Sequence, residues 1–348
     1  MKFNVSEIDA RYNFKITMMN NVSSERKEQY ERFCRTAQVP LYSKPWWLDA
    51  VCEPDNWDVW LYENNGVVVA AMPYYFEDRQ GRKYITKAPL TQNNGIVFAY
   101  PPNSKLVAKS IFEEKVIDAA CSYIESLQLD VYEQQYQTTF VNCLPFLWNG
   151  YKPNVRYTYI IENTTDLDAV WNDIASKKRS IVKKGQKNSV FSTKINIEEF
   201  YKEHEKIYAK QGLPCPFSFA LWKRVADACL AHNAGQISCR RAGDGNVAAV
   251  SFVAWDERFV YKLMGGPMPE YAKLDAYSAL TWDEIILAHR LGLMYDFEGS
   301  VIKRISKSFR EYGAVPKPYY RIRKVFNPEI IREEAENSIS VLQKQEGE

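Results

Sequence analysis

The sequence has little histidine and no closely paired cysteines. Only His204, His232 and His289 occur among its 348 residues, and none lies at metal-ligand spacing from another. The seven cysteines are scattered and form no C-x-x-C pair, so we expect free, mostly buried thiols. These absences disfavour zinc sites and Ser-His-Asp mechanisms, and we predict no metal site.

Long hydrophobic runs are also absent. The longest apolar stretch, residues 67–72, is far shorter than the ~20 residues that a membrane-spanning helix needs. Glu7, Asp9 and Arg11 interrupt the region where a signal peptide would carry its apolar segment. We therefore expect a cytoplasmic protein without a transmembrane segment.

Neither sign of charge dominates the chain. Lysine and arginine total 45 against 43 aspartates and glutamates, a net charge of +2, so composition alone does not indicate a nucleic-acid partner. With 46% hydrophobic residues the chain can form a sizeable core. Because its length exceeds the ~100–200 residues typical of one domain, we expect two domains. Its oligomeric state does not follow from the sequence.

A helix, a strand, a glycine turn and a second strand occur twice. The first copy covers residues 46–71 with the turn Asn64-Asn65-Gly66, and the second covers residues 221–250 with the turn Gly243-Asp244-Gly245. Such turns supply the positive φ that hairpins require. Helix-hairpin units also resemble one another by chance, but the shared aromatic, turn and Ala-Ala positions favour a duplication. Although residues 243–248 fit the pattern G-x-G-x-x-A, they precede a strand, so we interpret them as a hairpin turn.

Glycine and proline interrupt the pattern near residues 149–154, which places a domain boundary there. We predict an N-terminal domain at residues 1–150, a C-terminal domain at 151–328 and a polar, partly helical tail at 329–348. The predicted elements of the second half are a strand at 157–161, a helix opening at Thr165-Asp166, a helix at 197–210, strands within 236–263, a helix at 276–291, a strand at 293–297, a helix at 302–312 and a strand at 319–325. This order predicts an α/β fold with a mixed sheet.

Three segments carry a resemblance to a known family. They are Tyr295-Asp296-Phe297-Glu298-Gly299-Ser300 followed by Phe309-Arg310-Glu311-Tyr312-Gly313-Ala314, the basic stretch 171–184, and Ala88-Pro89-Leu90-Thr91-Gln92-Asn93-Asn94-Gly95. Together they resemble Fem-type aminoacyltransferases, which act on peptidoglycan precursors, and related GNAT acyltransferases. The likeness spans about residues 43–324 and is strongest at its end.

The resemblance implies two tandem GNAT-like domains that transfer an acyl or aminoacyl group to an amine. The donor would be an acyl-CoA or an aminoacyl-tRNA acting as co-substrate, with no tightly bound cofactor. The acceptor would be a small molecule or a cell-wall precursor, and Thr91, Gln92 and Asn93 would line its channel.

The sequence departs from the family pattern in two places that bear on the identity of the acyl donor. No long heptad arm is inserted between Phe200 and Gln236, which weakens the tRNA interpretation. In place of the usual pyrophosphate loop the chain has residues 265–271, followed by Asp275, which is placed to cap the next helix. That helix start could still hold a phosphate, so acetyl-CoA is permitted rather than indicated.

Asp296 and Glu298 are the candidate catalytic carboxylates. Two apart in a predicted strand, they would share one face, and one would accept the proton of the attacking amine. The alternative is that they cap the following helix and pair with Lys303 or Arg304. Tyr261 is a candidate proton donor and Lys262 a candidate phosphate contact, or both lie on a solvated strand face. Tyr277 and Ser278 are weaker candidates for donor binding.

Basic residues cluster in three places. The clusters are Lys177, Lys178, Arg179, Lys183, Lys184 and Lys187; Lys303, Arg304, Lys307 and Arg310; and Arg321, Arg323 and Lys324. They indicate a local positive field for a phosphate-bearing ligand, and we assign Lys178, Arg179, Lys303 and Lys307 to donor binding. The alternative is a set of solvated faces. A second possible function is a polyanion-binding module, for tRNA or a nucleotide, without catalysis.

Overall fold

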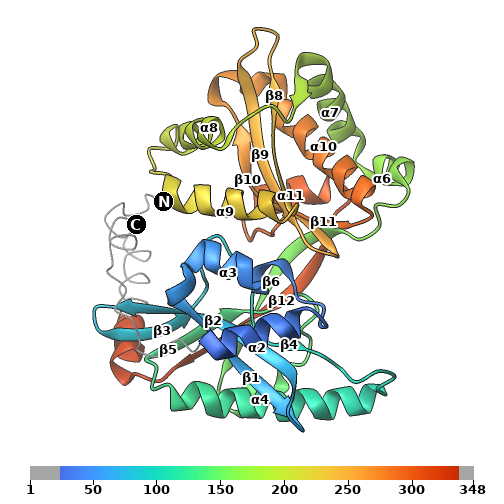
Figure 1. Ribbon diagram of the computed structural model, residues 1–348. Helices are drawn as coiled ribbons and strands as arrows, with labels where there is room; N and C mark the ends of the chain where they lie inside the picture. Colours follow the sequence, from blue (N-terminus) through green and yellow to red (C-terminus); the bar gives the residue numbers. More distant parts are fainter. Residues whose placement is uncertain (1–23, 337–348) are drawn as a thin grey trace. The chain divides into compact units, whose positions relative to one another are not determined.

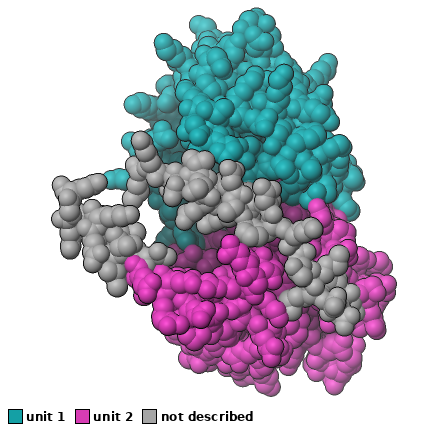
Figure 2. Space-filling view, turned by 90° about the vertical axis from the view of Figure 1, so that its left-hand side faces the viewer, with its two compact units in different colours: residues 1–13, 156–318 teal, residues 14–155, 319–348 magenta. Residues whose placement is uncertain are grey.

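The computed structural model describes residues 24–336, which fall into two compact units (Figure 2). Unit 1 contains residues 156–318, and the described part of unit 2 contains residues 24–155 and 319–336. The chain therefore returns to unit 2 after completing unit 1. The two domains proposed from the sequence are each a single continuous segment and do not include this return. The physical reason is a pairing between distant segments, in which Arg321 to Val325 lie antiparallel to Val131 to Gln135. In the described range no helix is long and apolar enough to cross a membrane.

Unit 2 has a mixed sheet in the order β1-β2-β3-β5-β12, with β4 paired to β2. The β3–β5 pair is parallel, whereas the β1–β2, β2–β3, β2–β4 and β5–β12 pairs are antiparallel. Its elements are α2 (Ser24–Cys34), η1 (Leu41–Ser43), α3 (Pro45–Cys52), η2 (Pro54–Asn56), β1 (Trp57–Asn64), β2 (Val67–Arg79), β3 (Arg82–Thr86), β4 (Val97–Phe98), α4 (Leu106–Ser126), β5 (Val131–Gln135) and α5 (Leu144–Trp148).

Unit 1 has a mixed sheet in the order β6-β11-β10-β9-β8-β7. Its elements are α6 (Leu167–Asp173), α7 (Ser176–Asn188), β7 (Val190–Ser192), α8 (Ile197–Ala209), α9 (Phe219–Ala231), β8 (Gly235–Arg241), β9 (Val247–Trp255), β10 (Phe259–Pro267), η3 (Pro269–Leu274), α10 (Ala276–Leu291), β11 (Met294–Asp296) and α11 (Lys303–Arg310). Two further strands, β6 (Lys152–Ile161) and β12 (Val315–Val325), contribute residues to both units. Residues 328–336 are helical, and the rest of the predicted tail lies outside the described residues.

Both units have the same order of helices and strands around the central sheet. In each, a helix precedes three consecutive antiparallel strands, a long helix follows, and the next strand is parallel to the third. In unit 2 these are α3, β1, β2, β3, α4 and β5, and in unit 1 they are α9, β8, β9, β10, α10 and β11. The predicted helix, strand, turn and strand are present in both places, and the α/β mixed-sheet fold is confirmed.

Helices cover both faces of the unit 1 sheet (Figure 1). Trp222 of α9 packs on Phe252 with ring centroids 4.9 Å apart, whereas Ile285 of α10 packs in the cluster that contains Val253. Neighbouring residues of a strand point to opposite faces, so α9 and α10 lie on opposite sides of β9. We refer to these two sides as the α9 face and the α10 face.

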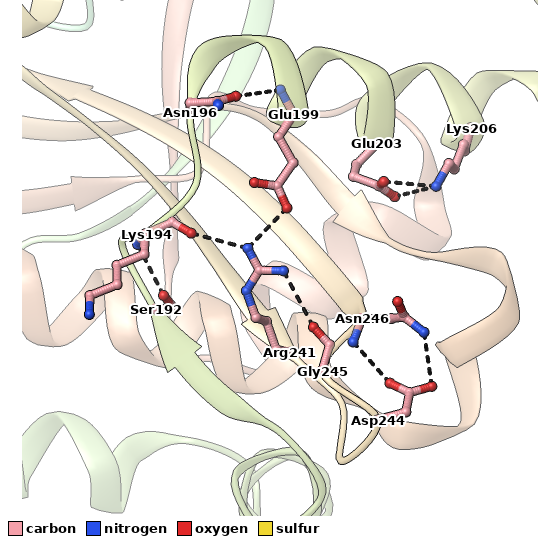
Figure 3. Close-up of polar contacts among 10 residues, drawn as sticks. All are labelled: Ser192, Lys194, Asn196, Glu199, Glu203, Lys206, Arg241, Asp244, Gly245 and Asn246. Carbon is pink, nitrogen blue, oxygen red and sulfur yellow. Dashed lines mark hydrogen bonds and ion pairs between the residues drawn. The ribbon is translucent and has the colours of Figure 1, made fainter.

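The glycine segment at residues 243–245 is a hairpin turn between β8 and β9, as predicted. Asp244 accepts hydrogen bonds from the backbone N–H and the side-chain amide of Asn246, at 3.0 and 3.1 Å (Figure 3). Nearby, Arg241 forms an ion pair with Glu199 at 2.9 Å, and Asn196 caps α8. The turn opens no helix, which excludes a dinucleotide fingerprint here.

Candidate active site

The candidate site of unit 1 lies where two parallel strands separate. β10 pairs with β11 only from Phe259 to Tyr261, whose last partner is Asp296. β10 then continues to Pro267, and its register with β9 shifts between Lys262 and Met264. A register shift bends a strand and increases its twist. Beyond Tyr261, this edge of β10 therefore has no strand partner among residues 24–336.

Asp296 closes β11 with its carboxylate buried at 4% exposure. Its Oδ1 accepts hydrogen bonds from the hydroxyl of Thr158 on β6 and from the backbone N–H of Glu298, the latter at 2.8 Å. Within the described chain its Oδ2 accepts none. Burial raises the pKa of Asp296 to about 6, although both hydrogen bonds oppose the rise. The carboxylate is thus fixed through one oxygen, and the other is available to a ligand.

The prediction that Asp296 and Glu298 share one strand face is wrong in its geometry. β11 ends at Asp296, and Glu298 lies beyond it with a φ of +65°. The intervening turn brings the backbone of Glu298, rather than an alternating side chain, onto Asp296. Asp296 does not pair with Lys303 or Arg304, because its Oδ1 accepts from Thr158 and Glu298.

Gly299 sets the direction of this turn. Its φ is +73°, and a Cβ built there would lie 2.4 Å from the carbonyl oxygen of Tyr157. A side chain would therefore displace β6 or the turn that donates to Asp296.

We expect Gly299→Ala to lower the free energy of unfolding by more than the about 1–2 kcal/mol that positive φ alone costs. Gly212→Ala is the matched control, because Gly212 has a φ of +70° and nothing lies within 4 Å of its Cβ position. Urea denaturation of both variants measures the difference. Equal losses would show that the contact with Tyr157 does not constrain the turn.

Tyr261 lies beside Asp296 on the neighbouring strand. It is buried, and its hydroxyl donates to Oδ2 of Asp256 at 2.8 Å. Burial and the charge of Asp256 raise the pKa of Tyr261 well above its usual value, so its phenol is neutral at physiological pH. A neutral phenol remains a proton donor, which is the role predicted for it.

Lys262 points to the opposite face of β10, toward α10, where it forms a buried ion pair. Its Nζ lies 2.6 Å from Oε2 of Glu284, with the two side chains 7% and 1% exposed. Thr281 accepts from the same Nζ at 3.1 Å, and the Tyr295 hydroxyl donates to the same Oε2. Burial is the largest single effect and disfavours the ammonium, but the charges and hydrogen bonds of Glu284 and Tyr277 together outweigh it and raise the pKa of Lys262. Its ammonium therefore does not face solvent as a phosphate contact would.

The other predicted donor-binding residues of α7 and α10 divide into packing and capping roles. Lys178 is buried, with its Nζ 3.2 Å from Glu311 and 3.1 Å from the Ser308 hydroxyl. Arg179 donates to the carbonyls of residues 171, 172 and 174 at the end of α6. The ring of Tyr277 lies 4.5 Å from the ammonium of Lys262, and the carbonyl of Ser278 accepts from Tyr312 at 2.9 Å.

The first turn of α10 is packed tightly against α7. A Cβ at Gly185 would lie 2.4 Å from the carbonyl oxygen of Asp275, so glycine allows this close approach. Asp275 occupies the N-cap position but makes no side-chain cap, contrary to prediction. It has a φ of +59°, and its carboxylate instead accepts from Lys184 at 2.7 Å. One lysine of α7 is thereby held beside the start of α10.

The two remaining basic clusters differ in whether their side chains form ion pairs. Arg321, Arg323 and Lys324 of unit 2 form ion pairs with Glu133, Glu334 and Glu125. Lys303, Arg304, Lys307 and Arg310 of α11 are exposed, and their side chains make no hydrogen bond or ion pair within residues 24–336. The α11 cluster thus keeps its positive field, whereas the cluster of unit 2 is largely neutralised.

The three predicted acceptor-channel residues lie in the unit 2 loop between β3 and β4. Thr91 is buried, accepts from Trp47 at 3.0 Å and donates to the carbonyl of Pro89 at 3.0 Å. Its hydroxyl is therefore engaged within the loop. Gln92 and Asn93 are half-buried and remain candidates for contact with an acceptor.

Histidine and cysteine have packing roles in the described chain. His204 is buried against Phe200 and Phe217, and burial lowers its pKa to about 4, so it is neutral at physiological pH. Nδ1 of His289 lies 2.6 Å from the carbonyl of Thr164. All seven cysteines are free, and no group of metal-ligating residues occurs between residues 24 and 336.

Three residues of the site were not identified from the sequence. Thr158 orients Asp296, and Glu284 and Tyr295 complete the network of Lys262. Thr158 stands in a β-rich run, and Glu284 stands among apolar residues of a predicted helix. A charged residue at a buried helix position is the one local signal that could have indicated Glu284.

A comparison with protein families finds one match within unit 1. A family model described as an acetyltransferase (GNAT) domain matches residues 171–301, which include β10, α10 and Asp296. No curated protein matches the sequence.

Solved structures with the same fold span nearly the whole chain at low sequence identity. FemX matches with a TM-score of 0.65 at 10% identity, over 88% of this chain and 97% of its own. The C-terminal domain of a putative lysylphosphatidylglycerol synthetase from Agrobacterium fabrum matches at 0.54 and 10% identity, over 86% and 92%. L-PGS from Bacillus licheniformis matches at 0.51 and 10% identity, over 88% and 93%. The chain therefore shares the fold of these solved structures, and its residues 171–301 are similar to an acetyltransferase (GNAT) domain.

Proposed function

We propose that the chain transfers an acyl or aminoacyl group to an amine, with Asp296 as the general base. The observation that carries this proposal is the state of Asp296 at the point where β10 and β11 separate. One carboxylate oxygen is held by Thr158 and Glu298, the other lacks a protein donor, and the pKa is about 6. A base is most effective when its pKa lies near the working pH.

In the proposed reaction, Oδ2 of Asp296 accepts a proton from the attacking amine. The amine nitrogen bonds to the acyl carbon, and the bond from that carbon to the donor sulfur or oxygen breaks. The leaving group takes up a proton, for which the neutral phenol of Tyr261 on the adjacent strand is the proposed donor once it is released from Asp256. Protons and electron pairs balance without a metal.

The donor would lie along the free edge of β10. An extended, amide-bearing arm can hydrogen-bond to an unpartnered strand edge as an added strand does. Its phosphates would approach the start of α10, where the helix dipole favours negative charge. Lys184 lies at the same place, paired with Asp275. An acyl-CoA satisfies both conditions, and an aminoacyl-tRNA remains the other donor class.

The acceptor is proposed from structural neighbours alone. FemX and the lysylphosphatidylglycerol synthetases share the fold, and the names of the latter refer to an aminoacylated lipid. A cell-wall precursor or another amine-bearing or hydroxyl-bearing envelope molecule is the acceptor class to test first.

We expect transfer activity to fall with decreasing pH below about 6. Asp296 accepts a proton only when it is ionised, so kcat/KM should drop about tenfold per pH unit on the acid side. Purified protein is incubated with acyl-CoAs or charged tRNAs and amine acceptors, and the product is measured by mass spectrometry across the pH range. A profile that is flat between pH 4 and 7 would exclude Asp296 as the base, and no transfer from either donor class would contradict the proposed function.

The second candidate is a polyanion-binding module without catalysis, and the unpaired cations of α11 favour it. In that case the chain would bind tRNA or nucleotides in a salt-dependent way but form no product. Asp296→Asn would then leave the binding unchanged.

A further inference from the structure

Helix α11 presents a strongly charged face that no residue among 156–318 of unit 1 neutralises. Lys303, Lys307 and Arg310 follow the i, i+4, i+7 spacing of one helix face, and Arg304 lies next to them. All four are exposed and lack an ion pair within the described chain. The helix is anchored through other residues, because Phe309 packs on Tyr159 and Ser306 lies 2.6 Å from the Tyr159 hydroxyl.

The two acidic residues that flank α11 in sequence do not balance this face. Glu311 is paired with Lys178 at 3.2 Å. Glu298 contributes to the raised pKa of Tyr261 on β10, and no ion pair joins it to the four cations in the described chain. The four cations therefore remain available to an anionic ligand.

Exposed apolar residues adjoin the cations. Val301 and Ile302 immediately precede α11 and are 72% and 57% exposed. Tyr157 is 46% exposed and, by strand alternation, shares the face of β6 that carries Tyr159. The backbone of Tyr157 also adjoins Gly299. We define the α11 surface as Tyr157, Val301, Ile302, Lys303, Arg304, Lys307 and Arg310.

We propose that the α11 surface docks unit 1 onto an anionic phospholipid membrane. Cations near a membrane bind anionic headgroups, whereas aliphatic and aromatic side chains insert at the boundary with the acyl chains. An RNA surface would use the cations but gain little from two exposed aliphatic side chains. The combination of both features favours a lipid surface over a nucleic acid.

This inference extends the proposed function without depending on its chemistry. In the sequence, Val301 and Ile302 follow within a few residues of Asp296 and of Glu298, whose backbone N–H donates to the Asp296 carboxylate. Docking would place the candidate site next to the membrane, where a lipid-borne acceptor is found. Lipid binding can be measured without any donor or acceptor, so a failure of one proposal is distinguishable from a failure of the other.

The test is flotation of the full chain with vesicles of equimolar phosphatidylcholine and phosphatidylglycerol, compared with phosphatidylcholine alone. We expect binding only to the anionic vesicles, weakening with salt. The variant Lys303→Gln/Lys307→Gln/Arg310→Gln should lower the partition coefficient on the order of 100-fold at low salt. The reason is that each of the three cations contributes a similar share of the binding free energy. Val301→Ser/Ile302→Ser should lower it roughly tenfold through lost apolar insertion.

A triple variant with the same loss of charge elsewhere, Lys187→Gln/Lys202→Gln/Lys210→Gln, is the matched control and should bind nearly as the wild type does. Equal losses in the two triple variants would mean that net charge rather than the α11 surface governs binding, which overturns the proposal. It is also overturned if the Val301→Ser/Ile302→Ser variant binds normally. Finally, wild-type protein that binds bulk tRNA through the α11 cations but not the vesicles would identify a nucleic-acid surface instead.

Discussion

Replacing Asp296 with asparagine is expected to lower the rate of transfer by about 10²–10⁴-fold, the usual contribution of a general base. The variant keeps an oxygen where Oδ1 accepts from Thr158 and Glu298, but its amide cannot accept the proton of the amine. Single-turnover rates with saturating donor measure the loss. Activity within tenfold of the wild type would assign the base to another residue.

The same substitution should not destabilise the fold at pH 7. The pKa of Asp296 in the folded chain, about 6, lies above its usual value, so the folded state binds this proton more tightly than the unfolded state does. The stability from this group is therefore present at low pH and is lost as pH rises through about 6. At pH 7 asparagine removes a buried charge, and thermal unfolding should show an equal or higher midpoint.

Thr158→Val separates the positioning role of Thr158 from catalysis. The hydroxyl of Thr158 lowers the pKa of Asp296, so its removal should move the acid limb of the pH–rate profile to higher pH. A reduced rate with an unmoved limb would indicate that Thr158 has only a structural role.

Replacing Lys262 with methionine is expected to lower the free energy of unfolding by about 3–5 kcal/mol, because it leaves a buried carboxylate without its cation. The loss of unfolding free energy should be near the upper end of this range, because Oε1 of Glu284 already lacks a hydrogen-bond partner. Lys184→Met is the matched control, as it breaks an ion pair whose lysine is 54% exposed. That variant should lose less than about 1 kcal/mol.

Restoring charge balance should restore stability. In Lys262→Met/Glu284→Gln the amide oxygen still accepts from Tyr295, and no buried charge remains. The double variant should therefore be more stable than Lys262→Met in urea denaturation. If it is equally unstable, packing of the lysine stem rather than the ion pair accounts for the loss.

Most of the local structure could be predicted from the sequence. The helices of unit 1, the hairpin turn at Asp244 and the duplicated unit follow from side-chain period and turn residues, which act over a few neighbouring positions. The resemblance near Asp296 also located the end of the strand that carries it. The shared face of Asp296 and Glu298 was wrong because β11 ends at Asp296 and Glu298 itself adopts a positive φ, which ends strand alternation.

The sequence by itself determined the elements, the mixed α/β class and the carboxylate to examine first. Only the tertiary structure decided which charges are buried together, as with Lys262 and Glu284, and which remain exposed, as on α11. It also decided that β12 pairs with β5 rather than completing the second half alone. The physical reason is range: turns and helical periods depend on adjacent residues, whereas ion pairs, strand order and a raised pKa arise between segments that only folding brings together.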